Sequence, residues 1–514
     1  MASSQSAVLA APRTSQEAAP LLLPRADLSS SSSQDHHHPH GDASLTTPRQ
    51  LLRIAIPFFL ILTAVEFAAA LCAAGVAALV EGSLCRSAFP DLVTDPYGDA
   101  RCKHEAVQAD LAWIIGMENT ISVVPGLLMS IPYGIIADKY GPNIVLCLVW
   151  AGQFLSEGGH LLVCLNPQLF NVRWIYASSC MTLIGGGGAT YSAMRFLVGA
   201  SLVSEKNRTT LFFYMQAYST FIGFFTGPAV YFIMSRGGPV AAQGVGVLLL
   251  GLMMIPGFAM PRKLPNTPLV TTSPFSSSTT TTTTIATIKA RAVDVLASAV
   301  DVLASAASTL RLVFGHNLPL TLLLGGVVFT TLGAYETTFR LQYATKRFGW
   351  TWAEAGLLSS VVSVANLATL VVVLPALSWL MLRRDGVSAL QKDLWLARGS
   401  GCVQVLGSFL TALAPTGPAF VAAIALYECN RGYMPSMVSV IVSVAERAGI
   451  AQQTTVYACV STMSATGAML AGPVVASAFR VGLQWGQSWY GLPFLAAGLL
   501  QLFTLLILIY VRQK

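Results

Sequence analysis

Long apolar runs, separated by short polar turns, dominate this chain of 514 residues. A helix that crosses a bilayer needs roughly 20 mainly apolar residues, and its backbone must satisfy its own hydrogen bonds because water is absent at that depth. Twelve runs reach that length, six on each side of a long polar insert. The pattern therefore predicts an all-α membrane protein with twelve transmembrane helices in two six-helix halves. The predicted spans are 54–80, 110–137, 143–165, 174–203, 210–234, 239–260, 317–341, 352–382, 396–414, 417–445, 454–480 and 488–511.

Composition divides the chain into four segments. Residues 1–50 are rich in Ser, Pro, Ala and His, and they predict a disordered cytosolic tail. Residues 51–260 and 316–514 hold the two halves. Residues 261–315 predict a cytosolic linker with an amphipathic helix, which lies either on the inner membrane face or against a regulatory partner. Its apolar stripe comprises Val293, Leu296, Val300, Leu303, Ala307 and Leu310.

The charge distribution indicates the topology. Hydrophobic residues make up 54% of the chain and charged residues only 10%, which is unlike a soluble protein of this size. Short cytosolic loops carry an excess of Lys and Arg, and most of the 30 basic residues fall on inner segments when the N-terminus is cytosolic. We therefore expect both termini in the cytosol. The net charge of +7 indicates contact with anionic lipid of the bilayer and no nucleic-acid partner.

An internal repeat links the fifth and eleventh predicted spans. Gly223 and Gly227-Pro228 form a small-x-x-x-Gly-Pro pattern, and the same pattern ends at Gly472-Pro473. Spans five and eleven are six apart, as expected if the second half duplicates the first. Small residues let helices approach closely, while Pro frees a carbonyl and bends the helix. We interpret these positions as helix-bend motifs.

A charged turn separates the second and third predicted spans. Gly134, Asp138, Lys139 and Gly141 have the G-x-x-x-D-[RK]-x-G spacing of the major facilitator superfamily, which the chain resembles over about 50–514. Cys102 to Gly116 and Gln342 to Trp350 resemble fungal members that are distantly similar to proton-coupled folate transporters. The chain departs from the family pattern after Gly141, where Pro142-Asn143 replace the usual basic residues.

The resemblance implies the major facilitator fold and secondary transport by alternating access. It also implies a cytosolic latch, in which Gly134 lets the second span press against the eleventh. Asp138 would face the N-terminus of that helix, and Lys139 would pair with a neighbouring acid. Without basic residues at 142–143, we expect this latch to be weaker or differently partnered.

Charged and titratable side chains inside the spans are the candidates for the cavity and for proton coupling. Each charge costs about 2.5–3.5 kcal/mol on insertion scales, so it marks function by default. The candidates are Glu66, Glu118, Glu157, His160, Arg195, Glu336, Arg340, Glu428 and Arg431. Family architecture places spans one, four, seven and ten around the cavity. The six candidates on those spans therefore rank highest: Glu66, Arg195, Glu336, Arg340, Glu428 and Arg431.

The spacing of these residues suggests roles for some of them. Glu336 and Arg340, like Glu428 and Arg431, can neutralise each other on one helix face, either as structural ion pairs or as functional ones. Glu66 has no partner in its own helix and could load and release a proton. His160 stands three residues after Glu157, so the two either share a proton relay or leave His160 at the interface.

Cysteines and histidines predict one disulfide and no metal or cofactor site. Cys85 and Cys102 fall in the loop predicted at 81–109, on the oxidising outer side, where a bond would staple the loop. The His36 to His40 cluster is interpreted as part of the flexible tail. The sequon at Asn207 would face the cytosol and stay unused.

The sequence favours a carrier over a pump or an enzyme. No G-x-x-x-x-G-K-[ST] phosphate loop is present, and no set of nucleophile, base or metal ligands has catalytic spacing. We predict a monomeric, proton-linked carrier of a small organic solute. Export of a secondary metabolite is expected by analogy with fungal relatives, and nutrient or vitamin uptake or a non-transporting sensor are the alternatives. The plasma membrane is favoured, and Glu17 to Leu22, which resemble an acidic dileucine signal, keep a vacuolar membrane as the alternative.

Overall fold

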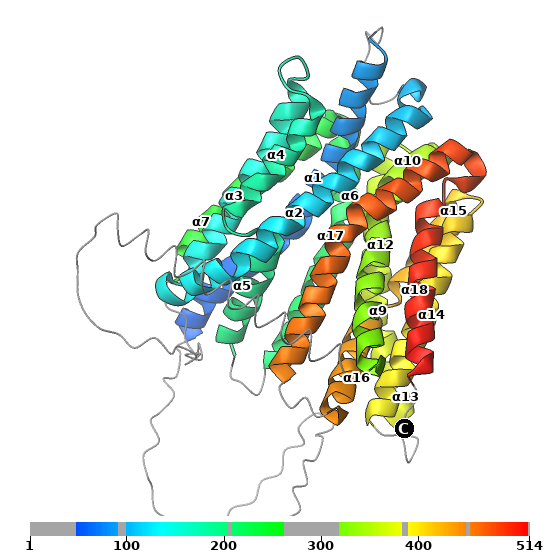
Figure 1. Ribbon diagram of the computed structural model, residues 1–514. Coiled ribbons are helices and arrows are strands. Elements are labelled where there is room, and N and C mark those ends of the chain that lie inside the picture. Colours follow the sequence, from blue (N-terminus) through cyan, green and yellow to red (C-terminus); the bar gives the residue numbers. More distant parts are fainter. Residues whose placement is uncertain are drawn as a thin grey trace, which may run out of the picture. The chain divides into compact units, whose positions relative to one another are not determined.

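A computed structural model describes residues 48–90, 99–203, 208–261, 318–382, 389–448 and 453–511. The predictions for the tail, the dileucine-like signal, the insert helix and the sequon lie outside these residues. Throughout the described ranges, regular secondary structure is helical and no strand occurs (Figure 1).

The N-terminal group of helices, α1–α7, follows the predicted spans with three differences. Helix α1 continues to Ala88, beyond the expected end at 80, because the buried Glu81 finds polar partners there. The fourth span is broken at Gly185–Gly187, which all have positive φ, and α6 joins two predicted spans across Gly238 (φ 70°). The elements are α1 (Pro48–Ala88), η2 (Ala100–Lys103), α2 (Glu105–Tyr140), α3 (Pro142–Leu165), η3 (Val172–Trp174), α4 (Ile175–Ser179), η4 (Cys180–Leu183), α5 (Gly187–Ser201), α6 (Arg208–Leu252) and α7 (Met254–Ala259).

The C-terminal group, α9–α18, also contains interrupted helices. The seventh span changes from α9 to the 3-10 turn η6 and then to α10, and the eighth contains the π-helical turn η7. The elements are α9 (Leu318–Ala334), η6 (Tyr335–Phe339), α10 (Arg340–Phe348), α11 (Trp352–Gly356), α12 (Leu358–Ala368), η7 (Thr369–Val373), α13 (Leu374–Leu382), α14 (Ala389–Leu413), α15 (Gly417–Glu428), α16 (Tyr433–Arg447), α17 (Gln453–Trp485), η8 (Gln487–Trp489) and α18 (Leu492–Tyr510).

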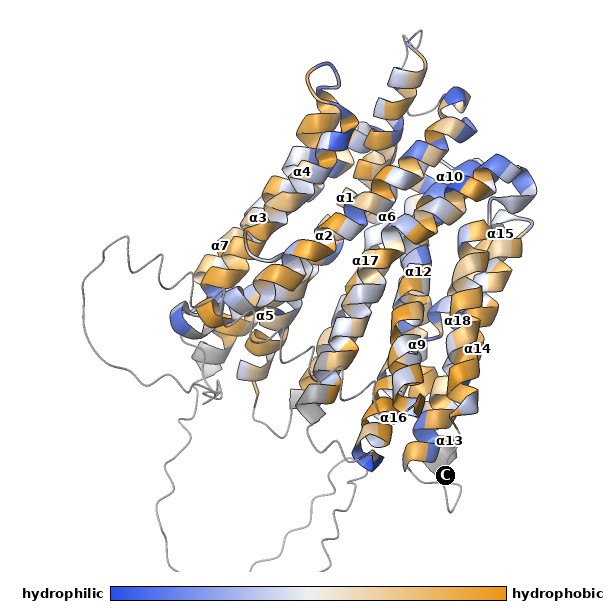
Figure 2. Cartoon of the chain, viewed as in Figure 1, coloured by the Kyte–Doolittle hydropathy of each residue, from blue (hydrophilic) through white to orange (hydrophobic). Residues whose placement is uncertain are grey.

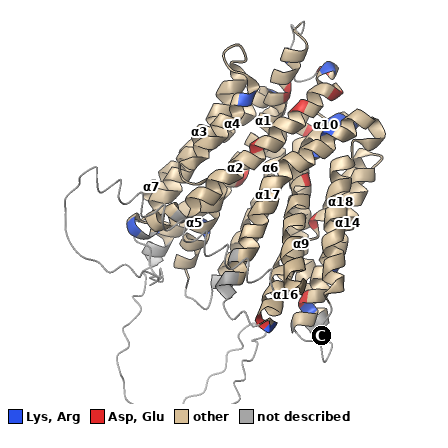
Figure 3. Ribbon diagram, viewed as in Figure 1, with Lys and Arg blue, Asp and Glu red and all other residues tan. Residues whose placement is uncertain are grey.

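Eight helical stretches of the described chain are long and apolar enough to cross a membrane, judged by length and composition. One of them, Thr210–Ala259, covers two predicted spans, whereas 174–203, 396–414 and 417–445 are not among the eight. Figure 2 shows apolar residues along the length of the helices, and Figure 3 shows charged residues mainly toward their ends. The described part of the chain is thus all-helical and has the long apolar helices that an integral membrane protein needs.

The two groups of helices are joined at one end. There, one apolar cluster packs Ala109 and Ala112 of α2 against C-terminal residues such as Phe479, and another packs Trp352 against N-terminal residues such as Leu111. Toward the other end, each group has an apolar cluster of its own. We call these the joined end and the separated end.

Both repeat motifs form close contacts between the groups. A Cβ added at Gly223 would lie 2.6 Å from Ser363 Oγ, and one at Gly472 would collide with the carbonyl of Gly116. Each Pro also removes the donor for the carbonyl four residues earlier. A hydroxyl from the opposite group bonds each of these carbonyls. Ser360 Oγ donates to Phe224 O at 2.6 Å, and Thr120 Oγ1 donates to Met469 O at 3.1 Å.

The charged turn between α2 and α3 differs from the expected latch. A Cβ at Gly134 would meet nothing within 4 Å, so α2 does not press on α17 there; the two helices meet instead at Gly116, toward the joined end. Lys139 is exposed, with its ammonium 5.2 Å from the Tyr140 ring centroid, and the side chain of Asp138 lies outside the described part of the chain. The latch contact at Gly134 is therefore not made in this conformation.

The departure at 142–143 has a structural explanation. Gly141 ends α2 with φ 99°, a conformation that favours glycine, and Pro142 is the first residue of α3. Asn143 is buried and donates to Met260 O at 3.3 Å, which ties the start of α3 to the end of α7. Pro142 and Asn143 therefore stabilise the turn between α2 and α3, and they do not make the contacts of a charged latch.

Candidate functional site

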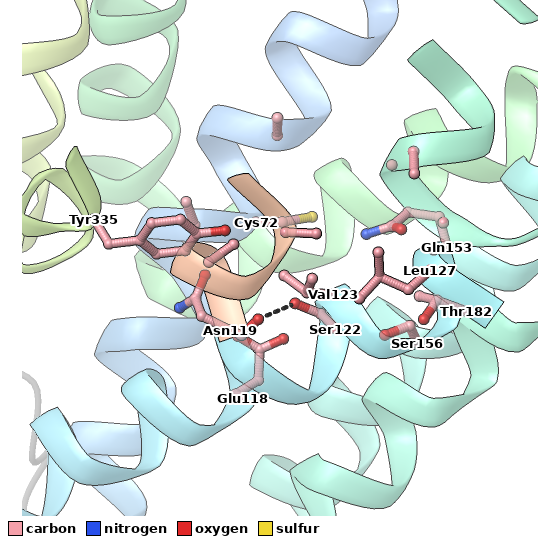
Figure 4. A pocket seen from close by; sticks show the side chains of 18 of the residues that line it. Cys72, Glu118, Asn119, Ser122, Val123, Leu127, Gln153, Ser156, Thr182 and Tyr335 are labelled. Atoms are coloured by element: carbon pink, nitrogen blue, oxygen red, sulfur yellow. Dashed lines mark hydrogen bonds between the residues drawn. The ribbon is translucent and has the colours of Figure 1, made fainter. Parts of the chain in front are cut away.

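A cavity of about 720 Å³, which we call the main cavity, lies between the two groups of helices. Helices α1, α2, α3 and α5 line it on one side, and Thr331, Tyr335 and residues of α17 line it on the other. Figure 4 shows Glu118, Asn119 and Ser122 of α2 on one wall, with Tyr335 of η6 across from them. Of the nine charged and titratable candidates in the spans, Glu118, Glu157 and His160 line this cavity.

A buried hydroxyl connects Glu118 to His160. Ser179 Oγ lies 3.1 Å from Glu118 Oε1 and 3.1 Å from His160 Nε2. The three side chains come from α2, α4 and α3, and Ser179 is fully buried. Since a hydroxyl can donate and accept at the same time, it can bridge a carboxylate and an imidazole.

Glu157 extends this connection at the other nitrogen of the ring. His160 Nδ1 lies 3.3 Å from Glu157 Oε2, and Gln243 Nε2 of α6 donates to the same oxygen at 2.9 Å. Gln153 donates to the second oxygen at 3.3 Å. We call the sequence Glu118, Ser179, His160, Glu157 and Gln243 the polar chain.

The polar chain contains three of the nine candidate residues, Glu118, Glu157 and His160. It places His160 beside Glu157, as the relay interpretation requires, and brings Glu118 to the same network from another helix. The highest-ranked candidates lie elsewhere. Sequence reasoning did not identify Ser179 and Gln243, since they are neutral and lie 19 and 86 residues from their partners. Their only signal was a polar side chain inside an apolar span.

Glu66 and Arg195 form a separate polar group beside α6. Arg195 Nη2 donates to Ser219 Oγ at 2.9 Å and to Met215 O at 3.2 Å. Glu66 lies next to Ser219 and within electrostatic reach of Arg195. Glu66 is therefore not a lone acid: its partners are on other helices.

The four C-terminal candidates form one cluster instead of two self-contained pairs. Glu428 accepts from Arg340 Nη1 at 2.6 Å and from Arg431 Nη2 at 2.9 Å, whereas Arg340 Nη2 is 3.6 Å from Glu336 Oε1. Arg431 Nε also donates to Asn366 Oδ1. The tightest link thus runs between helices, from α10 to α15, and we call these four residues the arginine cluster.

Buried polar contacts hold the joined end together. Glu81 of α1 bonds Lys103 Nζ at 2.6 Å, Trp352 Nε1 of the opposite group at 2.7 Å, and Gln108 Nε2. Gln342 Nε2 donates to Gln108 O at 2.7 Å and so adds a second link between the groups.

A disulfide joins Cys85 of α1 to Cys102 of η2, with their Cα atoms 5.1 Å apart. Cys85 lies in a helix rather than in a loop, because α1 is longer than predicted. The bond holds η2, and with it Lys103, next to the end of α1.

Comparison with known proteins identifies fungal transporters. No family model matches the chain. It is 28% identical to the MFS efflux pump atnC of Emericella nidulans, over 78% of this chain and 75% of that protein. It is 26% identical to the efflux pump ustT of Aspergillus flavus, over 76% and 74%, and 21% identical to the MFS-type transporter avaK of Aspergillus versicolor, over 84% and 87%. These relatives are transporters, not enzymes.

Solved structures of transporters have a fold similar to that of this chain. The nucleoside transporter NupG superposes with a TM-score of 0.58 at 14% identity, covering 90% of this chain and 100% of that chain. The xylose transporter XylE from E. coli, in a partially occluded inward open conformation, superposes with a TM-score of 0.55 at 14% identity, covering 90% of this chain and 100% of that chain. None of these five proteins is named as a folate transporter, so that finer resemblance stays a prediction.

Proposed function

We propose that this chain, a transporter of the major facilitator superfamily, exports a small organic solute in exchange for, or together with, protons. The polar chain carries this proposal. It places two carboxylates and an imidazole in one hydrogen-bonded series on the wall of the main cavity. Titratable groups inside a membrane are costly, and in carriers they commonly form proton relays.

A proton can move along the polar chain by short steps. Ser179 can pass it between Glu118 and His160, and His160 can exchange it with Glu157 through its other nitrogen. Each transfer changes the charge on the cavity wall, and so changes how well the wall binds a solute. Solute and proton binding are then linked in both directions.

Twelve spans in two halves account for the helices. The broken elements α4, η4 and α5 together form the fourth span, and α6 with α7 forms the fifth and sixth. In the C-terminal half, α14 forms the ninth span and α15 with α16 the tenth. The halves occupy 51–260 and 316–514, with a tail at 1–50 and a cytosolic linker at 261–315.

The disulfide supports an orientation for this architecture. Disulfides persist on the oxidising side of a membrane, so the joined end faces outward and both termini face the cytosol. The conformation is then closed outside, and the separated end opens the cavity to the cytosol. Rocking of the halves would close the separated end and form the latch contact at Gly134. We favour the plasma membrane and a monomer.

Export is supported by the two relatives that are named as efflux pumps, atnC and ustT. The test compares metabolites in cells and medium with and without the gene, and measures flux of the affected compound into proteoliposomes under an imposed proton gradient. We expect accumulation in deletion cells and flux that collapses with the gradient. Unchanged profiles would overturn export, accumulation in the wild type alone would indicate uptake, and ligand binding without flux would indicate a sensor.

A further inference from the structure

Arg340 lies in the arginine cluster with hydrogen-bonding capacity that the protein does not use. The residue is only 5% exposed, yet within the described chain its Nε and Nη2 have no hydrogen-bond partner. Its guanidinium also lies over the Tyr427 ring, 4.6 Å from the centroid. Nη2 has only the longer ionic contact with Glu336 Oε1, at 3.6 Å. Buried donors left without acceptors are costly, so two buried nitrogens without a hydrogen bond point to a missing acceptor.

Arg340, which carries these two nitrogens, lines a cavity. A cavity of about 320 Å³ is lined by Arg340, Arg431 and Glu428, with Thr337, Ser359 and apolar residues completing its wall. Arg431 reaches it with a side chain that is 43% exposed, and the carboxylate of Glu428 is already shared between the two arginines.

This smaller cavity adjoins the main one. Ala73 of α1 lines both, and a further cavity of about 260 Å³ shares Thr337 with the smaller cavity and Glu118 with the main one. The arginines therefore lie in a cavity next to the one that would hold the rest of the solute.

We propose that the cavity at Arg340 and Arg431 binds an anionic group of the transported solute, most simply a carboxylate. This inference rests on the proposed transport function and adds a substrate class to it: organic anions. Guanidinium groups match carboxylates geometrically, and each supplies several donors in a fixed plane. The bound carboxylate provides the acceptor that Arg340 lacks.

Charge balance connects this site to proton movement. The arginine cluster contains two arginines and two glutamates and is formally neutral, so an incoming carboxylate adds one negative charge. Neither oxygen of the fully buried Glu336 accepts a hydrogen bond from the described residues, and its nearest charged contact is Arg340 at 3.6 Å. A proton taken up by Glu336 would restore neutrality, since an uncompensated charge is costly at that depth.

The test uses three probes with one carbon skeleton: 3-phenylpropionate, 3-phenylpropanol and 3-phenylpropylamine. Binding to the purified full-length protein in lipid nanodiscs is measured by calorimetry without a proton gradient. We expect the carboxylate to bind at least about tenfold more tightly than the alcohol or the amine. Arg431→Gln should remove most of that preference, and Arg431→Lys should retain part of it. Arg431 is the residue to change because it is the more exposed of the two arginines.

Arg236→Gln is the matched control, since Arg236 is exposed and lies over Phe232, outside the cavity lining. Equal binding of the three probes to the wild type would overturn the site, as would tighter binding of the amine. An undiminished carboxylate preference in Arg431→Gln would also overturn it and would leave the cluster as a purely structural contact. Flux in proteoliposomes is measured separately. Carboxylate preference without proton-driven flux would count against the transport proposal alone.

Discussion

At the scale of single residues, position within a network matters more than charge alone. Glu118 was one of several acids that the sequence placed in the membrane, and the structure distinguishes it by its contact with Ser179 on the cavity wall. Glu66 has its partners beside α6, where Arg195 lies close. The two acids therefore have different expected effects when they are neutralised.

Neutralising Glu118 should uncouple transport from the proton gradient. Glu118→Gln keeps the size and the hydrogen bond to Ser179 but cannot exchange a proton. We expect flux driven by the proton gradient to fall by roughly tenfold or more, while exchange of solute without a gradient is largely retained. Flux of both kinds is measured in proteoliposomes.

Ser461→Ala is the control for this prediction, because Ser461 lines the same cavity from α17 and is not part of the polar chain. Full gradient-driven flux in Glu118→Gln would remove this residue from coupling.

The glycines of the charged turn should respond differently to alanine. Gly141 has φ 99°, so Gly141→Ala should lower the free energy of unfolding by about 1–3 kcal/mol. Gly134→Ala should have little effect, since its Cβ would meet no atom within 4 Å. Thermal unfolding in detergent measures both. A larger loss of stability for Gly134→Ala than for Gly141→Ala would contradict this assignment.

At the scale of elements, the proline bends are supported from the opposite half of the protein. Pro228 and Pro473 each leave a carbonyl without its helical donor, and hydroxyls of α12 and α2 replace that donor. The replacement occurs where glycine lets the helices approach. The proline bend and the contact with the opposite group therefore occur together, once near Pro228 and once near Pro473.

Removing either hydroxyl should weaken the contact between the helices. Thr120→Ala and Ser360→Ala should each lower stability by about 1 kcal/mol, since each leaves a carbonyl without its donor. Thr120→Ser should restore most of the loss, because it keeps the hydroxyl. The two losses should be additive, since the hydroxyls bond different helices. Equal stability of Thr120→Ala and Thr120→Ser would show that the hydroxyl does not contribute.

Much of the helical framework could be predicted from the sequence, because apolar runs and turns are local signals. Helix α3 begins at Pro142 and ends at Leu165, within one residue of the expected span. The end of α1 could not be predicted, because Glu81 is stabilised by Trp352, 271 residues away. The polar chain was only partly predictable for the same reason: Ser179 and Gln243 acquire their significance from partners on other helices.

At the scale of the whole molecule, the contacts between the two groups are unevenly distributed. The carboxylate of Glu81 accepts hydrogen bonds from Lys103 and Gln108 of its own group and from Trp352 of the other group. Apolar clusters cross between the groups only toward this end of the described chain. The joined end therefore determines how stable this conformation is relative to one that opens there.

Weakening the joined end should shift the protein toward that other conformation. Trp352→Phe removes one donor to the buried carboxylate of Glu81 but keeps an aromatic ring in the apolar cluster. A hydrogen bond to a charged group contributes about 1.5–3 kcal/mol, so the population that opens at this end should rise by roughly tenfold or more. Hydrogen–deuterium exchange should become faster in 99–110 and 340–352. Trp174→Phe, at an exposed tryptophan of η3, is the control and should leave exchange there unchanged. If Trp352→Phe exchanges at the control's rate, the Glu81 contact does not hold this end closed, and the apolar clusters together with other polar links, such as Gln342 to Gln108, must do so.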